Sequence, residues 1–133
     1  MVLPARYRER LSEICAGQIV VTIDPDQPCL LIYPLPQWEE VEEKINALPG
    51  FNKKARLIQR KLIGYATDVE VDANGRMLLS GPLRNYAQLE KKAVLIGQGN
   101  KFELWDEQLW DQLCMAADDD DGEIPAALME LTL

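Results

Sequence analysis

The chain has 133 residues, enough for one compact domain, and contains no histidine. The usual general base at neutral pH and the usual nitrogen ligand of zinc are therefore both missing, which excludes histidine-dependent hydrolysis. The net charge of −8 arises at the C-terminal end, where residues 106 to 130 include nine acidic side chains and no Lys or Arg. The remaining body carries +1, so composition neither requires nor excludes a nucleic-acid partner.

The cysteines and the lack of long apolar runs predict a cytoplasmic protein. Cys15, Cys29 and Cys114 are far apart and form no C-x-x-C pair. We therefore expect small core hydrophobes in a reducing compartment rather than disulfides or metal ligands. No apolar run approaches membrane-spanning length, and the chain does not open on a signal sequence, so no membrane partner is expected.

The first part of the chain predicts a short helix followed by a β-hairpin. Pro4 is typical of a first helical turn, where its missing N–H leaves no donor unsatisfied, and Tyr7–Leu11 would face the core. Two apolar runs of strand length follow, Ile19–Ile23 and Cys29–Tyr33. They are joined by the turn residues Asp24-Pro25-Asp26-Gln27-Pro28, which is typical of a hairpin.

Two helices of opposite charge are expected next. The first runs from residue 35 towards Leu48 with one apolar stripe, made of Trp38, Val41, Ile45 and Leu48, and it ends at Pro49-Gly50. The second covers about residues 52–63, with an apolar side made of Leu57, Ile58, Leu62 and Ile63. Four glutamates lie on the first helix, and four cations on the second: Lys53, Arg56, Arg60 and Lys61. This pattern fits an antiparallel pair with complementary charge, a subunit interface, or solvated faces.

The segment Val69–Leu79 carries the one motif with specific chemistry. Asn74-Gly75 between two apolar runs predicts a β-hairpin with a type I′ turn, since both residues tolerate positive φ. Asp72 can accept hydrogen bonds from the N–H groups of the turn and fix its shape. Arg76 would then lie at the rim of a rigid tip, suited to a phosphate or to the O6/N7 edge of guanine in the major groove. A plain hairpin with a solvated arginine is the alternative.

The last third repeats the order of helix and hairpin. Pro82 opens a helix that carries Leu83–Leu89 inward, and the strands Ala93–Gly97 and Lys101–Trp105 follow. The turn between them, Gln98-Gly99-Asn100, lacks the Walker spacing and lies between two strands, so it is interpreted as a plain turn rather than a phosphate loop. A closing helix is expected after the second strand.

The acidic C-terminal segment is predicted to be solvated and partly disordered. Asp118–Asp121 precede Gly122, but alignment of this glycine with that of an EF-hand puts Ala117 and Leu128 at the first and last ligand positions. No metal site is therefore predicted. Because no cluster of catalytic groups is evident either, the sequence predicts no enzymatic activity, no cofactor and no small-molecule substrate.

Comparison of the chain with itself indicates a tandem duplication. Three segments align in one order: residues 1–8 with 77–84, residues 19–23 with 93–97, and residues 29–33 with 101–105. In both units a tryptophan, Trp38 or Trp110, follows the last aromatic residue of the second strand by five positions. The two units should therefore share one fold.

Taken in order, these motifs resemble the MraZ family over about residues 2–113. The resemblance rests on the D-x-x-G-R turn of residues 72–76, the P-x-x-[YL]-R helix starts, the duplicated strand pair, and the segments 52–64 and 97–106. It implies an α+β fold in which two SpoVT/AbrB-like units interleave their hairpins into one small β-barrel, with a helical linker and a C-terminal helix. The expected division is 1–37 for the first unit, 38–64 for the linker, 65–110 for the second unit and 111–133 for the acidic segment.

The resemblance also implies a function. Members of the family form ring-like homo-oligomers that bind repeated sites in the promoter of the bacterial division and cell-wall gene cluster, and they usually repress it. The chain is thus expected to be a cytoplasmic, nucleoid-associated transcriptional regulator that binds double-stranded DNA. The expected contact residues are Arg76, Asp72, Asn74 and Gly75.

One departure from the family pattern concerns the first unit. In the family, each unit has a D-x-x-G-R turn directly before its helix, but Met1 aligns with Met77, the residue after Arg76. The first contact loop is therefore expected to be missing, either because the recorded start is internal or because the gene is shortened. An oligomeric interaction or assembly protein with weak or no DNA binding is the alternative function.

Overall fold

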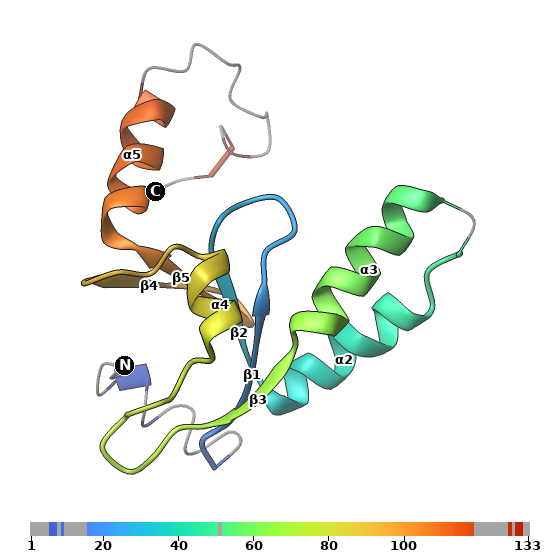
Figure 1. Cartoon of the computed structure of the whole chain (residues 1–133), viewed down its shortest axis with the longest axis horizontal. Helices are drawn as coiled ribbons and strands as arrows, with labels where there is room; N and C mark the ends of the chain where they lie inside the picture. Colours follow the sequence, from blue (N-terminus) through green and yellow to red (C-terminus); the bar gives the residue numbers. More distant parts are fainter. Residues whose placement is uncertain are drawn as a thin grey trace.

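The computed structural model describes residues 6, 7, 9, 16–50, 52–118, 128, 130 and 131. Within these residues the chain has an α+β fold, as expected (Figure 1). The strands are β1 (Gln18–Ile23), β2 (Leu30–Pro34), β3 (Thr67–Glu70), β4 (Ala93–Gln98) and β5 (Lys101–Asp106). The helices are α2 (Leu35–Asn46), α3 (Lys53–Tyr65), α4 (Gly81–Tyr86) and α5 (Glu107–Asp118). None of the helices in this part of the chain is long and apolar enough to cross a membrane.

The five strands form one antiparallel sheet in the order β3-β1-β2-β5-β4. The hairpin β1–β2 and the hairpin β4–β5 meet at its centre through β2 and β5. β3 pairs with the outer edge of β1, whereas no described strand pairs with the outer edge of β4. The sheet is therefore open over the described residues, and the closed barrel of swapped hairpins stays a prediction.

The two hairpins have the same register. Val20 lies opposite Tyr33, and at the aligned positions Val94 lies opposite Trp105. Between β2 and β5, Leu31 lies opposite Glu103 and is flanked by the pairs Leu30–Leu104 and Ile32–Phe102. A two-fold rotation about the Leu31–Glu103 pair exchanges these flanking pairs, so the geometry agrees with the duplication found in the sequence.

The tryptophans of the two units also occupy equivalent places. The rings of Tyr33 and Trp38 are 5.7 Å apart at 53°, and those of Trp105 and Trp110 are 5.9 Å apart at 58°. Each helix, α2 or α5, begins directly after its strand, which brings the tryptophan back over the last aromatic residue. The sequence spacing therefore predicted a real structural motif.

Both faces of the central strands are covered. One face packs against Val71, Met77, Leu79 and Leu83 in a cluster that includes Ile19, Val21, Ile23, Leu30, Ile32, Phe102 and Leu104. On the other face, α2 and α3 cover a cluster of Val20, Leu31, Tyr33, Trp38 and Ile45. The one fully buried hydroxyl of β1, Thr22, donates a hydrogen bond of 2.6 Å to the carbonyl of Leu62 and so ties β1 to α3.

The helical linker differs from its predicted pattern at three apolar residues. Leu48 is 50% exposed because α2 has already ended at Asn46. On α3, Ile58 and Leu62 are half-buried, but Leu57 is 51% exposed and Ile63 is 38% exposed. The side of α3 that packs on the rest of the protein is therefore narrower than the sequence predicted. The helix expected after Pro4 lies mostly outside the described residues, although Arg6, Tyr7 and Glu9 are helical.

Candidate nucleic-acid interface

The turn from Asp72 to Arg76 is closed by four hydrogen bonds. The backbone N–H of Asp72 donates to the carbonyl of Arg76, and that of Gly75 to the carbonyl of Asp72, both at 3.0 Å. The side-chain Oδ1 of Asp72 accepts from the backbone N–H groups of Asn74 and Arg76, both at 2.9 Å. The expectation that Asp72 fixes the turn through hydrogen bonds is therefore confirmed.

The predicted type I′ turn is wrong. A type I′ turn needs positive φ at both central residues. Gly75 has a φ of +79°, but among the described non-glycine residues only Ala16 and Gln88 have positive φ, so Asn74 does not. The geometry is that of an ordinary turn followed by one glycine in the left-handed region, the usual form of three-residue hairpin loops. Asp72 favours it because its carboxylate holds the N–H of Asn74.

The strand expected after Arg76 is also absent from the described structure. β3 enters the turn paired with β1, and the N–H of Val71 continues this pairing with a 2.8 Å bond to the carbonyl of Gly17. Gly17 is required here, because a Cβ at this position would lie 2.6 Å from the carbonyl oxygen of Val71. Residues 77–79 leave the turn without forming a strand, and they pack on the core with Met77 and Leu79 buried.

Arg76 is presented outward from a well-anchored tip. Val71 before the turn is 7% exposed and Met77 after it is 4% exposed, so both ends of the turn are fixed in the core. Arg76, Asn74 and Asp72 are exposed, whereas Gly75 is buried. Within the described residues, the guanidinium of Arg76 makes no hydrogen bond or ion pair. It is therefore free to bind an anion.

The other flank of the turn is acidic. A cavity of about 580 Å³ lies beside the turn, lined by Ala16 and Gly17 as well as by three residues with carboxylates: Glu9, Glu70 and Asp72. A nucleic acid would be repelled from this flank and would have to approach on the side of Arg76. The electrostatics of the turn are thus one-sided.

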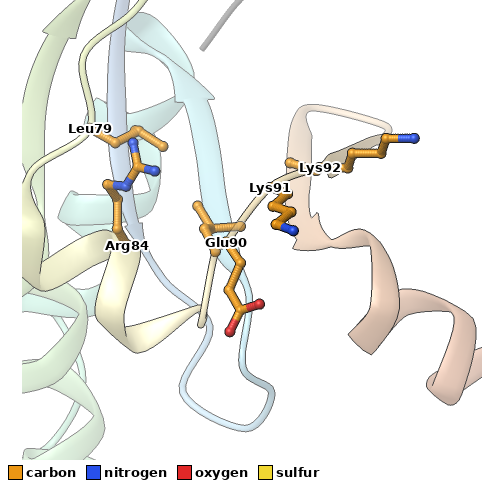
Figure 2. A pocket seen from close by; sticks show the side chains of 7 residues that line it. Leu79, Arg84, Glu90, Lys91 and Lys92 are labelled. Carbon is orange, nitrogen blue, oxygen red and sulfur yellow. The ribbon is translucent and has the colours of Figure 1, made fainter.

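A second basic region, which the sequence reading missed, lies beside α4 and the start of β4. A cavity of about 360 Å³ is lined by Leu79, Arg84, Leu89, Glu90, Lys91, Lys92 and Ala93. Figure 2 shows that the guanidinium of Arg84 points towards Leu79, whereas the ammonium groups of Lys91 and Lys92 point elsewhere. The cations do not converge on one point, so the cavity resembles a charged surface more than a small-ligand site. Three cations within nine residues were the available sequence signal.

The buried cysteine is chemically inert. Cys29 is fully buried directly before β2, and this burial, with a contribution from Asp24, raises the pKa of its thiol to about 12. A thiol that stays protonated is neither a nucleophile nor a metal ligand. Its expected role as a small core residue is confirmed, but Cys114 is exposed, so the same expectation was wrong there. Cys15 lies outside the described residues.

Comparisons with known proteins agree with the duplicated architecture. The family model for MraZ proteins, described as antitoxin-like, matches residues 1–61 and again residues 62–130. The chain is 50% identical over 137 residues to the transcriptional regulator MraZ of Halorhodospira halophila, covering 100% of this chain and 90% of the relative. It is 48% identical over 136 residues to that of Pseudomonas aeruginosa and 51% identical over 134 residues to that of Saccharophagus degradans, with the same coverage.

Proposed function

Since the chain belongs to the MraZ family, we propose that it is a sequence-specific, DNA-binding transcriptional regulator that contacts DNA through the Asp72–Arg76 turn. The observation that supports this most directly is the guanidinium of Arg76, which is exposed at the end of a turn with fixed geometry and has no hydrogen-bond or ion-pair partner among the described residues. A preorganised arginine loses little entropy when it makes a bidentate contact with guanine or phosphate. Asp72, Asn74 and Gly75 would position it and add contacts of their own.

The small number of DNA contacts that one subunit can make favours binding as an oligomer. Each phosphate contact contributes about 0.9 or less to the salt slope, and one turn per subunit offers few contacts. Several subunits on adjacent promoter repeats would raise the overall affinity by about 10² to 10⁴-fold without a new type of contact. We therefore include in the proposal a ring-like homo-oligomer, associated with the nucleoid in the cytoplasm, that represses the division and cell-wall gene cluster.

The closed barrel of interleaved hairpins belongs to the same proposal. β3 occupies the outer edge of β1, and the equivalent edge of β4 has no partner among the described strands. One more strand at that edge would make the two halves of the sheet equivalent. The two-fold relation between the hairpins supports such an arrangement.

The test is promoter binding by an Arg76→Ala variant. Fluorescence anisotropy with a labelled promoter fragment should show a clear loss of affinity for Arg76→Ala, whereas Lys101→Ala, the same loss of charge at the far turn, should bind as the unmodified chain does. Thermal stability should change by no more than about 0.5 kcal/mol, as for most surface substitutions. A large fall in melting temperature would instead make Arg76 a structural residue.

The acidic flank of the turn supports a second candidate, an oligomeric assembly protein with weak or no DNA binding. The three carboxylates beside the turn would oppose a nearby phosphate backbone. An unmodified chain that forms oligomers but binds no promoter fragment even at low salt would favour this candidate.

A further inference from the structure

The helical hairpin of α2 and α3 has two charged outer faces of opposite sign. We propose that it forms a head-to-tail interface between copies of this chain, in which the acidic face of α2 in one copy docks on the basic face of α3 in the next. The acidic face is defined by Glu39, Glu40 and Glu43, and the basic face by Lys53, Arg56, Leu57 and Arg60. This inference rests on one part of the proposed function, the assembly of several copies of the chain, and does not depend on DNA binding.

The acidic face of α2 points away from the sheet. Trp38 and Ile45 are buried against the sheet, so the opposite side of the helix is outward. Glu39, Glu40 and Glu43 lie there and are exposed. Glu42 differs, because its carboxylate accepts a hydrogen bond of 3.2 Å from Nε1 of Trp38 and is therefore already engaged.

The basic face of α3 has an apolar centre. Lys53, Arg56 and Arg60 are exposed, and at about 100° per residue Lys53, Leu57 and Arg60 fall on one side of the helix. Leu57 lies among these cations with 51% of its surface exposed. An apolar residue surrounded by charges is the arrangement of a small protein interface, with a dry centre and a polar rim.

The charges of the two helices do not neutralise each other within one chain. α2 and α3 lie side by side (Figure 1), and Nε2 of Gln59 donates a 2.8 Å hydrogen bond to the carbonyl of Ile45 between them. Even so, none of the described Lys or Arg residues lies within 4.0 Å of a carboxylate of another described residue. Both faces are therefore held in place and available to a partner.

A second copy fits these faces better than DNA does. A phosphate backbone would attract α3, but it would be repelled by α2 next to it and would gain nothing from Leu57. Another copy of the chain satisfies both faces at once, since each copy carries one of each sign. Because the two faces differ, the contact is heterologous, and repetition of it generates a ring or an open chain of subunits.

Charge reversal on each face separately tests the interface. Glu40→Lys/Glu43→Lys makes both faces basic, and Arg56→Glu/Arg60→Glu makes both acidic. Each variant alone should therefore form smaller assemblies than the unmodified chain, seen as a lower molar mass in light scattering without DNA. Like charges across the interface should raise the dissociation constant about a hundredfold or more. An equimolar mixture should recover the oligomer, because each variant then offers the face that the other needs.

Controls separate this result from misfolding. Asp26→Lys/Asp111→Lys makes the same change of charge as Glu40→Lys/Glu43→Lys at exposed positions outside the hairpin and should keep the full mass. Circular dichroism and melting should show that all variants are folded. If a reversed variant unfolds, Glu40→Gln/Glu43→Gln and Leu57→Ser provide milder changes, each of which should still lower the mass.

Two outcomes would overturn the interface. An unmodified chain that is monomeric at the highest attainable concentration, or reversed variants of unchanged mass, would show that the hairpin does not join subunits. Loss of promoter binding by Arg56→Glu/Arg60→Glu at unchanged mass would identify α3 as a DNA surface instead. Since mass is measured without DNA, failure here is distinct from failure of the Arg76 test.

Discussion

A single carboxylate controls the turn that carries Arg76. Oδ1 of Asp72 accepts two backbone hydrogen bonds, and one of the donors is the N–H of Arg76 itself. Asp72→Ala should therefore lower the free energy of unfolding by about 1 kcal/mol, the usual effect of losing such a cap. It should also weaken promoter binding, because Arg76 is no longer preorganised.

Urea denaturation and fluorescence anisotropy measure the two effects of Asp72→Ala. Asp72→Asn is the matched control, since its amide oxygen can still accept both bonds while the negative charge is gone. If Asp72→Asn binds DNA as weakly as Asp72→Ala does, the charge of Asp72, rather than its hydrogen bonds, supports binding.

The buried thiol of Cys29 should make stability depend on pH at the alkaline end. Its pKa is raised from 9.0 to about 12, so the folded chain keeps the proton that the unfolded chain releases. The contribution to stability is complete below pH 9, and it falls by up to about 1.4 kcal/mol per pH unit as the pH rises towards 12. Cys29→Ala should flatten this decline, whereas Cys114→Ala should not. An identical decline in all three chains would assign it to other groups, such as Tyr33 and Tyr86, whose pKa values are also raised by burial.

At this scale the sequence predicted chemistry better than conformation. The acceptor role of Asp72 follows from its position two residues before an amide donor, which is a local property. The turn type was harder to predict, because Asp72 and Asn74 are both residues that favour turns. The sequence does not show that Asp72 accepts the backbone hydrogen bonds while Asn74 keeps a negative φ. The exposure of Leu57 depended on how far α3 rotates on β1, which the pattern of apolar residues leaves open.

Among the elements, the two equivalent tryptophans should differ in their effect on stability. Trp38 on α2 is 5% exposed and belongs to the core cluster against which Leu62 of α3 packs, while Trp110 on α5 is only half-buried. Trp38→Ala should therefore cost about 3–5 kcal/mol, as for a large core residue, and Trp110→Ala clearly less. Urea denaturation of the two variants compares them directly. Equal losses would mean that α5 is packed more tightly than its exposure indicates.

The outer edge of β4 is the second testable feature at this scale. No described strand pairs with this edge, and an edge whose N–H and C=O groups lack partners favours aggregation or mispairing. An N-terminal extension that carries a strand and a D-x-x-G-R turn should raise the melting temperature by pairing with this edge. It should also raise promoter affinity by adding a second arginine turn to each subunit. Equal melting and equal affinity in the two forms would show that the first unit does not need its own turn.

The strands and helices themselves were largely predictable. The four hairpin strands follow from apolar runs between turn residues, and Pro36 and Pro82 mark the starts of α2 and α4. The strand expected after Arg76 was wrong because Met77 and Leu79 pack into the core cluster on one face of the central strands instead of pairing along β3. The sequence does not distinguish the two arrangements. Side chains alternate between two sides in a paired strand and also in an extended segment without a strand partner, so both give the same pattern of alternating apolar residues.

For the whole molecule, the proposed oligomer predicts a strong dependence on the number of promoter repeats. A fragment with several repeats should bind about 10² to 10⁴-fold more tightly than a fragment with one, because later subunits bind at high effective concentration. The slope of affinity against salt should be steeper for the longer fragment, since more phosphates are contacted. Anisotropy at two salt concentrations measures both. Equal affinity for both fragments would argue against cooperative rings.

Assembly is the level that the sequence predicted least. The register of the two hairpins was contained in the self-alignment, because equivalent residues must form equivalent pairs. Closure into a barrel and contact between subunits depend on edges and faces that lie far apart in sequence. Only the order β3-β1-β2-β5-β4 revealed which strand edges have no partner among the described strands.

The pair of Leu31 and Glu103 between β2 and β5 shows how a duplicated single chain differs from a dimer of identical subunits. In a complex of two identical subunits, the residue on the rotation axis meets its own copy, so any substitution there occurs twice. Here Leu31 meets Glu103, and the two have different surroundings: Leu31 lies in the cluster beneath α2, while Glu103 accepts a 2.8 Å hydrogen bond from Nε1 of Trp105. Likewise Thr22, bonded to α3, aligns with an isoleucine, Ile96. Joining the halves in one gene thus allows each half to evolve separately, one carrying the Asp72–Arg76 turn and the other carrying the residues that pack against the helical linker.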